Sequence, residues 1–408
     1  MTSARRLEAT LPDGPEGLVG RPVYLDYNAT TPVDPRVRDA ALPYLTREFG
    51  NPSSSHVFGL EPHQAIEQAR TEVTELVGGR RDGERCGGVV FTGSGSEANL
   101  LALRGSVLAP SAPRSHIITQ ATEHPAVLAT CAALARHHGT RVTVLPVRPD
   151  GLVEAALLEQ MLEHPASAAT VGGRTIISVM AANNETGALQ PIGELAAIAH
   201  AYGAVIHCDA AQAAGKVPLD VDGLDVDLLT VVGHKMYAPK GIAALYVRAG
   251  LDLEPVVYGG GQEGGRRAGT ESVALIAALG TAARLAADDL AHGAGERLAA
   301  LRDRMQQGLE RRLPGGIRLN GPVVERLPNT LNVSITGVVA HELLAAVATL
   351  AASTGSACHS GQHTPSPVLT AMGADRDRAL GAVRLSLGRW TTTEDVDIAV
   401  DEIARAAR

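Results

Sequence analysis

Short apolar runs rich in β-branched residues alternate with amphipathic segments between about residues 65 and 250, and this alternation most constrains the fold. The expected strands are Gly88–Thr92, His116–Thr119, Arg141–Val147, Thr175–Ala181, Val205–Asp209, Asp227–Val232 and Ile242–Val247. Apolar residues at helical spacing separate several of them, at Ala126–His137, Val153–Glu163 and Ile192–Tyr202. Parallel strands joined by crossover helices produce this pattern. The sequence therefore predicts an α/β fold with a large domain built on a mainly parallel, doubly wound sheet.

The pattern changes after about residue 270. A long helical stretch, Glu271–Leu313, breaks near Gly293, and short strands at 317–320, 330–335 and 383–387 then alternate with helices that begin at His341 and Thr392. This order predicts a smaller α+β domain. We expect an N-terminal segment, residues 1–64, that packs with the small domain, a large domain over 65–270, and a small C-terminal domain over 271–408.

Charge and cysteine content exclude several classes of partner. The 36 basic and 44 acidic residues give a net charge of −8 without a basic run, which argues against nucleic acid and anionic membrane surfaces. The four cysteines form no CxxC pair, so neither a structural metal site nor a disulfide scaffold is expected. No apolar stretch reaches 18 residues, and we expect a reduced, cytoplasmic protein.

Polar residues follow several of the expected strands directly. Ligands of open α/β sheets bind beyond the carboxyl ends of the strands, so these side chains should share one edge. Residues 93–98 (GSGSEA) after the first strand predict a phosphate cradle, because glycines let the backbone approach an anion at a helix N-terminus. The other strand ends carry an Asn-Asn-Glu-Thr-Gly turn from Asn183, then Asp209 with Gln212, and then Gly233-His234-Lys235.

Lysine is rare in this chain. Only three of the 36 basic residues are lysines, namely Lys216, Lys235 and Lys240. Arginine cannot replace a lysine whose amine must lose its proton. Lys235 follows a strand almost directly, whereas Lys216 and Lys240 are interpreted as solvent-facing loop residues. An amine, a carboxylate at Asp209 and an anion cradle at one sheet edge together suit pyridoxal phosphate.

The same glycine pattern has an alternative interpretation as a dinucleotide fingerprint. That fingerprint expects an acidic residue about 20 positions further on. No Asp or Glu occurs between Ala98 and Thr122, and the first acid, Glu123, has a different local context. The cradle is therefore favoured over dinucleotide binding.

Two further residues have patterns typical of reactive side chains. His124 follows an expected strand, where an imidazole can stack on a cofactor ring and move protons. Cys358 lies in a Gly/Ser-rich segment without apolar periodicity, unlike Cys131 and Cys208, which fit buried positions. The neighbouring His359 would help to activate the Cys358 thiol as a nucleophile.

The chain resembles the cysteine desulfurase and selenocysteine lyase group of the class V aminotransferase-like, fold-type I pyridoxal-phosphate enzymes. Motifs matching this group run in order through residues 24–32 (YLDYNATTP), 50–53 (GNPS), 91–97 (FTGSGSE), 122–124 (TEH), 183–187 (NNETG), 209–212 (DAAQ), 233–235 (GHK), 259–263 (GGGQE), 267–270 (RAGT), 355–358 (GSAC) and 383–389 (VRLSLGR). The resemblance covers about residues 22–400.

The resemblance implies a role for each matched position. Lys235 would bind the cofactor aldehyde and remove the substrate Cα proton, and Cys358 would accept sulfur. On the cofactor ring, His124 would stack, Asp209 would pair with the ring nitrogen and Gln212 with the ring hydroxyl. The phosphate would be held by Gly95, Ser96 and His234. Thr270 from a second subunit of a homodimer would also reach the phosphate. Asn28, Asn184 and Arg384 would bind the substrate, with Asn184 also counted among the cofactor contacts.

The implied reaction converts L-cysteine to L-alanine and leaves a persulfide on Cys358 for an unidentified acceptor protein. Val232 stands where many desulfurases have a phosphate-binding serine, and this form looks closer to the selenocysteine lyase branch. Selenocysteine lyase is therefore the first alternative, and another aminotransferase or C–S lyase of the same fold is the second. A dinucleotide-binding or scaffold protein is the non-enzyme alternative.

Overall fold

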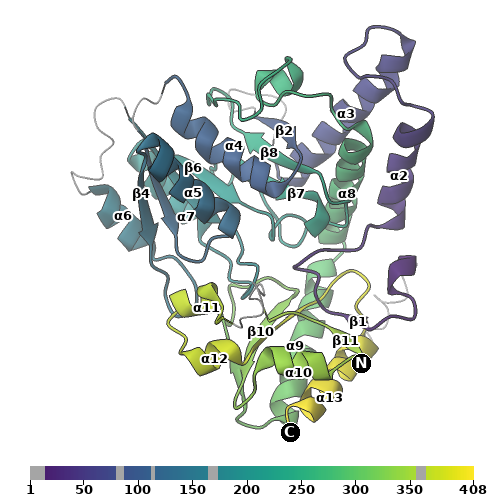
Figure 1. Ribbon diagram of the computed structural model, residues 1–408, viewed down its shortest axis with the longest axis vertical. Helices are drawn as coiled ribbons and strands as arrows, with labels where there is room; N and C mark the ends of the chain where they lie inside the picture. The colour runs from purple at the N-terminus through teal and green to yellow at the C-terminus, as the bar shows by residue number, and fades with distance from the viewer. Residues whose placement is uncertain (1–13, 80–86, 112–114, 164–172, 355–363) are drawn as a thin grey trace.

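The structure, a computed structural model, describes residues 14–79, 87–111, 115–163, 173–354 and 364–408. Figure 1 shows a larger part built around one sheet and, below it in that view, a smaller part formed mainly by the C-terminal third of the chain. Long helices on the right of the view extend along the larger part.

The large part contains a seven-stranded sheet in the order β2-β8-β7-β6-β5-β3-β4. Its strands are β2 (Gly88–Thr92), β3 (Ser115–Gln120), β4 (Arg141–Leu145), β5 (Arg174–Met180), β6 (Val205–Asp209), β7 (Leu228–Val232) and β8 (Ala243–Val247). Strand β8 runs antiparallel to both of its neighbours, and every pair from β7 to β4 is parallel. The prediction of an α/β fold with a mainly parallel sheet is confirmed.

Helices cover both faces of this sheet because successive strand residues point to opposite sides. Ile117 of β3 packs in a core with helices α4 (Gly95–Leu108) and α5 (Pro125–His138). The next residue, Ile118, packs in the main core with the helices of the other face. These are α3 (Val57–Leu76), α6 (Ala155–Glu163), α7 (Ile192–Ala201) and α8 (Val273–Ala291). The sheet is therefore doubly wound.

The smaller part has its own core. Strands β9 (Ile317–Leu319), β10 (Thr330–Ile335) and β12 (Ala382–Ser386) form an antiparallel sheet, and β1 (Val23–Tyr24) pairs with β11 (Leu350–Ala351). The helices are α9 (Ala294–Arg312), α10 (Ala340–Ala346), α11 (Pro367–Ala371), α12 (Arg376–Leu380) and α13 (Thr393–Ala406). Leu25, from the N-terminal segment, lies in this core beside residues of α9, β10 and α13.

The N-terminal segment and α8 connect the two parts. Residues of β1 belong to the smaller part, but Val37 of helix α2 (Pro35–Thr46) lies in the core of the large sheet. Helix α8 packs against α2 and α3, and its buried residues, such as Leu279, lie in that same large core. Thus α8, which was expected in the small domain, packs with the large one, because its buried face joins the large core beside α2 and α3.

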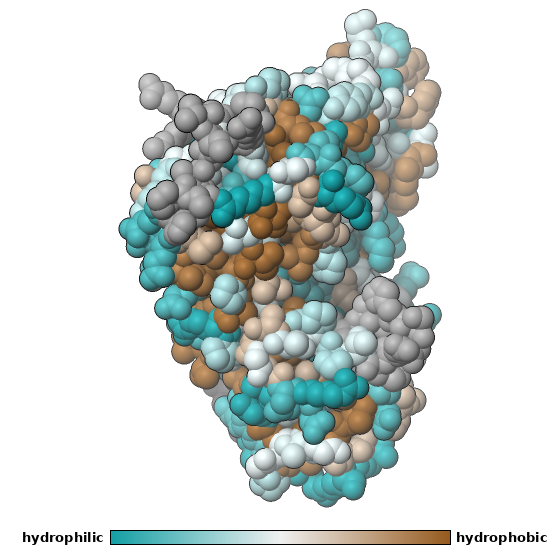
Figure 2. Space-filling view, turned by 60° about the vertical axis from the view of Figure 1, so that its left-hand side comes forward, coloured by the Kyte–Doolittle hydropathy of each residue, from teal (hydrophilic) through white to brown (hydrophobic). Residues whose placement is uncertain are grey.

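Edge strand β4 lies on the side of the molecule that Figure 2 turns forward. Apolar residues reach the surface among polar ones on this face, and Val144 of β4 is 49% exposed. Within the described ranges no helix combines the length and the apolar character that a membrane crossing requires.

Candidate active site

The carboxyl ends of the central strands open into a cavity of about 610 Å³. Ten of the twelve residues named from the sequence line it, namely Asn28, Gly95, Ser96, His124, Asn184, Asp209, Gln212, His234, Lys235 and Arg384. Thr270 lies elsewhere, on an exposed stretch of chain. Cys358 lies outside the described residues, whereas Ser353, five positions before it, lines the cavity.

Lys235 stands at the centre of this cavity. It ends the 3-10 turn η2 (Gly233–Lys235), which follows β7 directly. Its Nζ donates to the carbonyl oxygens of Asn28 at 2.6 Å and Ala29 at 2.8 Å. Burial, reinforced by the nearby Arg384 guanidinium, lowers the pKa of the Lys235 ammonium to about 8. A substantial fraction of this amine is therefore unprotonated, and nucleophilic, near neutral pH.

Asp209 places a carboxylate opposite the amine, at the end of β6. Its side chain is buried and held at both oxygens, by Asn99 Nδ2 at 2.7 Å and by the Ala211 N–H at 3.0 Å. Asn99 also leaves its Oδ1 buried without a hydrogen-bond partner among the described residues. The carboxylate is therefore fixed in position to pair with a cationic nitrogen in the cavity.

The start of α4 lies where the sequence predicts an anion cradle. The helix begins at Gly95, where the Ser94 side chain caps it by accepting from the Glu97 N–H at 3.1 Å. The N–H groups of the first turn, Gly95 and Ser96 among them, have no partners inside the helix. A Cβ on Gly95 would lie 2.5 Å from Val232 Cγ2, so only glycine leaves the cradle open.

His124 caps helix α5 from the rim of the cavity. Its Nδ1 accepts from the Ala126 N–H at 3.1 Å, so in the neutral ring the proton sits on Nε2. Burial lowers the pKa of His124, and the Asp209 carboxylate opposes this effect. The second histidine, His234, contacts Thr30 Oγ1 at 3.2 Å through Nδ1, and burial with the neighbouring lysines lowers its pKa to about 4. Both rings are therefore neutral at physiological pH.

Arg384 brings a guanidinium from β12 of the smaller part. Nη2 donates to Asp26 Oδ1 at 2.7 Å and Nη1 to the Asn184 carbonyl oxygen at 3.1 Å. Nε is buried without a hydrogen-bond partner among the described residues. Each terminal nitrogen carries two hydrogens, so both retain a donor for a carboxylate. Arg384, for which the family resemblance implies a role in substrate binding, is thus held in the cavity by Asp26.

Two comparisons identify the family of this chain. The family model described as "Aminotransferase class-V" matches residues 23–398. The chain is also 45% identical to a "Cysteine desulfurase" of Gluconacetobacter diazotrophicus, covering 93% of this chain and 92% of that protein.

The chain belongs to the class-V aminotransferase family. A solved structure described as "NifS-like protein" has a TM-score of 0.83 at 31% identity and covers 94% of this chain and 98% of its own. Another, described as "SspA in complex with cysteine", has a TM-score of 0.74 at 32% identity, and the match covers 90% of this chain and 99% of that chain. This match confirms the family resemblance and the fold-type I architecture expected from the motifs.

Lys216 corrects one interpretation of the sequence. Its side chain does not point into solvent. Its Nζ lies 2.6 Å from Gln212 Oε1 and 3.3 Å from Asn28 Oδ1, and both of these residues line the cavity around Lys235. Asn28 belongs to the N-terminal segment, which covers Lys216. The residues next to Lys216 in the sequence do not indicate this contact. Lys240, in contrast, is exposed at the rim, as expected.

Glu123 is a second buried group beside the site. Its Oε1 accepts from the Met180 N–H at 2.6 Å and from Gln120 Nε2 at 2.9 Å. Burial, and then the charge of Asp209, raise the pKa of Glu123 to about 8. The sequence feature that could have singled out Glu123 is its position in the Thr-Glu-His motif. That motif does not indicate that the carboxyl group keeps its proton.

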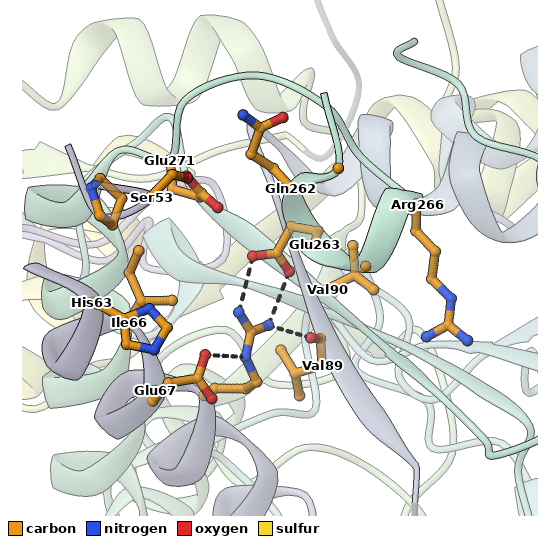
Figure 3. A pocket seen from close by; sticks show the side chains of 14 residues that line it. Ser53, His63, Ile66, Glu67, Val89, Val90, Gln262, Glu263, Arg266 and Glu271 are labelled. Carbon is orange, nitrogen blue, oxygen red and sulfur yellow. Dashed lines mark hydrogen bonds and ion pairs between the residues drawn. The ribbon is translucent and has the colours of Figure 1, made fainter. Parts of the chain in front are cut away.

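A second pocket, of about 850 Å³, lies beside edge strand β2 (Figure 3). Arg70 of α3 forms a two-pronged ion pair with Glu263, at 2.9 and 3.0 Å, and also donates to the Val89 carbonyl oxygen. Glu263 accepts from the Phe91 N–H at 2.9 Å. These contacts fix the 3-10 turn η3 (Gln262–Gly265) on β2, and the matched motifs at 50–53 and 259–263 meet here rather than in the lysine cavity.

No group of three or more His, Cys, Asp and Glu side chains suited to a metal ion occurs in the part of the chain that the structure describes. The polar groups of the cavity are an amine, a carboxylate, amides, imidazoles and a guanidinium.

Proposed function

We propose that this protein is a pyridoxal-phosphate-dependent cysteine desulfurase that converts L-cysteine to L-alanine and transfers the sulfur to Cys358 as a persulfide. The observation that carries the proposal is the Lys235 amine, with a pKa lowered to about 8, in one cavity with Asp209 and a helix N-terminus. The names of the cysteine desulfurase relative and of the cysteine-bound neighbour support cysteine as the substrate.

The cavity fits the cofactor in size and in donor set. Gly95 keeps the first turn of α4 open for a phosphate, and Ser96 adds a hydroxyl there. Asp209 would pair with the ring nitrogen, Gln212 with the ring hydroxyl, and His124 would stack on the ring. When bound, pyridoxal phosphate supplies an aldehyde that captures amines and a ring that accepts an electron pair.

Lys235 would act both as the residue that holds the aldehyde and as the base. Its lowered pKa makes the free amine available at neutral pH, and a free amine can take the substrate Cα proton at Nζ. The carbonyl oxygens of Asn28 and Ala29 orient this nitrogen at 2.6 and 2.8 Å. Arg384, Asn184 and Asn28 would orient the substrate through its carboxylate.

Cys358 would take the sulfur. It follows Ser353, which lines the cavity, by five positions, and a chain of that length spans at most about 18 Å at about 3.6 Å per residue. Its thiolate would attack the substrate Sγ, the substrate Cβ–Sγ bond would break, and the new sulfur–sulfur bond would form on Cys358. The carbon skeleton keeps the electron pair and gains the thiol proton, which gives alanine without an added oxidant. An unidentified acceptor protein would then remove the sulfur.

We further propose a homodimer in the cytoplasm. Thr270 is exposed and does not line the cavity of its own chain, in keeping with a role at the phosphate of a second subunit. Exposed apolar residues on the N-terminal helices and nearby, including Phe49 and Phe58 with ring centroids 5.8 Å apart, supply a surface for such contact. Buried free thiols at Cys131 and Cys208 suit a reducing compartment.

Selenocysteine lyase is the second candidate, favoured by one observation. Val232, in place of a serine, contributes an apolar surface to the cavity wall next to the cradle. The two activities differ in chalcogen preference, so relative turnover of cysteine and selenocysteine separates them. An aminotransferase or C–S lyase would consume a keto acid or release pyruvate instead.

The test is to incubate the purified, yellow protein with cysteine and to measure alanine together with the mass of the Cys358 peptide. The desulfurase proposal predicts alanine and a peptide heavier by one sulfur atom. Cys358→Ala should abolish alanine formation, whereas the matched control Cys86→Ala, outside every matched motif, should not. Undiminished alanine from Cys358→Ala would exclude the persulfide role, and pyruvate in place of alanine would exclude the desulfurase.

A further inference from the structure

Lys216 contacts two residues that line the active-site cavity and has no role in the proposed reaction. It follows Gln212 by four positions, in the turns after β6, and its Nζ lies 2.6 Å from Gln212 Oε1 and 3.3 Å from Asn28 Oδ1. Both amides are buried, at 4% and 1% exposure. A small cavity of about 50 Å³ is lined by both Lys216 and Lys235, and both amines contact Asn28, Lys235 at the backbone carbonyl oxygen and Lys216 at the side-chain oxygen.

The polarity of these hydrogen bonds fixes how each amide lies. A lysine side chain only donates when charged, whereas a primary amide has one accepting end and one donating end. Lys216 therefore holds the oxygen of Gln212 toward itself, and Gln212 Nε2 is left facing the Asn28 carbonyl oxygen, to which it donates at 2.8 Å. The flipped amide would set its NH₂ against the ammonium and its oxygen against that carbonyl.

Asn28 is held in the same way. Its Oδ1 faces two donors, Lys216 Nζ and Asn329 Nδ2 at 3.1 Å. Its Nδ2 faces two acceptors, the Asn184 carbonyl oxygen at 3.2 Å and Thr330 Oγ1 at 2.8 Å. Burial lowers the pKa of Lys216 well below its usual range, and even a neutral amine has the two N–H groups that the two oxygens require.

We propose that Lys216 is a positioning residue that fixes the amides of Gln212 and Asn28, so that the second N–H of Gln212 Nε2 is available to the ring hydroxyl of the cofactor. The inference rests on the proposed function, because it takes that hydroxyl to lie beside Gln212. Lys216 itself touches neither substrate nor cofactor; it acts through Gln212. A donating NH₂ stabilises the ionised ring oxygen, and an amide released from Lys216 no longer does so reliably.

The test uses Lys216→Met, which keeps the length of the side chain and removes its donors. We expect the variant apoprotein to bind pyridoxal phosphate about 10-fold more weakly, since one hydrogen bond to a buried group contributes about a factor of 10. The pH at which the absorbance of the bound cofactor changes should rise relative to the wild type. Arg311→Met, which removes an exposed cation from the last turn of α9, outside the cavity lining, should leave that pH unshifted.

A double mutant tests whether Lys216 acts through Gln212. Once Gln212→Ala has removed the amide, adding Lys216→Met should shift the absorbance transition no further. Equal, additive shifts in the two backgrounds, or a loss of stability in Lys216→Met with no spectral shift, would overturn the proposal. If Lys216→Met yields no folded protein, Lys216→Leu, which also removes the donors, must show the same shift. A wild-type protein without a bound chromophore would instead refute the proposed function.

Discussion

Glu123 offers a direct test of the electrostatics beside Asp209. The carboxyl group is buried, its Oε1 accepts two hydrogen bonds, and its Oε2 has no partner among the described residues. Replacing it by Gln keeps the accepting oxygen and puts an uncharged NH₂ where the unpartnered Oε2 lies. The variant therefore removes the ionisation of the side chain while changing its shape very little.

The pKa of Glu123 fixes the size and sign of the effect. Burial raises it from 4.5 to about 8, so between these values the folded protein holds a proton that the unfolded chain releases. The free energy of unfolding of the wild type therefore falls by about 1.4 kcal/mol per pH unit as the pH rises through this window, about 5 kcal/mol in all. This contribution to stability is complete below pH 4.5 and lost by pH 8. Glu123→Gln lacks it.

The assay is urea unfolding of the apoprotein at pH 5, 6, 7 and 8. We expect the stability of Glu123→Gln to rise relative to the wild type by about 1.4 kcal/mol per pH unit. Glu159→Gln, which replaces an exposed carboxylate on α6, is the matched control and should follow the wild type. Parallel curves for Glu123→Gln and the wild type would mean that Glu123 is ionised in the folded state, and the reasoning would be wrong.

Three further predictions concern the packing around the site. Arg389→Met removes the charged hydrogen bond from Arg389 Nη1 to the buried Asp34 carboxylate at 2.7 Å, while Arg36 still pairs with Asp34, and should lower the free energy of unfolding by about 1.5–3 kcal/mol in the same urea assay. Gly95→Ala puts a Cβ 2.5 Å from Val232 Cγ2 and should weaken pyridoxal phosphate binding at least about 10-fold. Adding Val232→Ala should restore part of the affinity. An unchanged affinity in Gly95→Ala would contradict a phosphate site at this turn. In the apoprotein, acylation of Lys235, followed by peptide mapping, should rise with pH through about 8; a midpoint at the usual lysine value of 10.5 would contradict the lowered pKa.

The sequence predicts an element correctly where the residues that determine it are neighbours along the chain. Strands β2 and β6 begin and end at the expected residues, because each is a short apolar run closed by glycine or aspartate. The residues after these ends meet in one cavity because parallel strands deliver their carboxyl ends to one edge. The prediction for Lys216 was wrong because its burial depends on Asn28, which is 188 positions away along the chain. The prediction for α8 was wrong because an amphipathic pattern does not indicate which core the apolar face packs against.

Residues 26–31 explain why the cavity needs both cores. The backbone N–H groups of Tyr27 and Asn28 donate to Ser386 of β12, which ties this segment to the smaller part. The Asn28 carbonyl oxygen then accepts from Lys235, which extends from the large sheet, while Asp26 binds Arg384. A displacement of the smaller part would therefore move the substrate anchor and the acceptors of the reactive amine together. The geometry between Lys235 and Arg384 is thus set by one short segment rather than by either core alone.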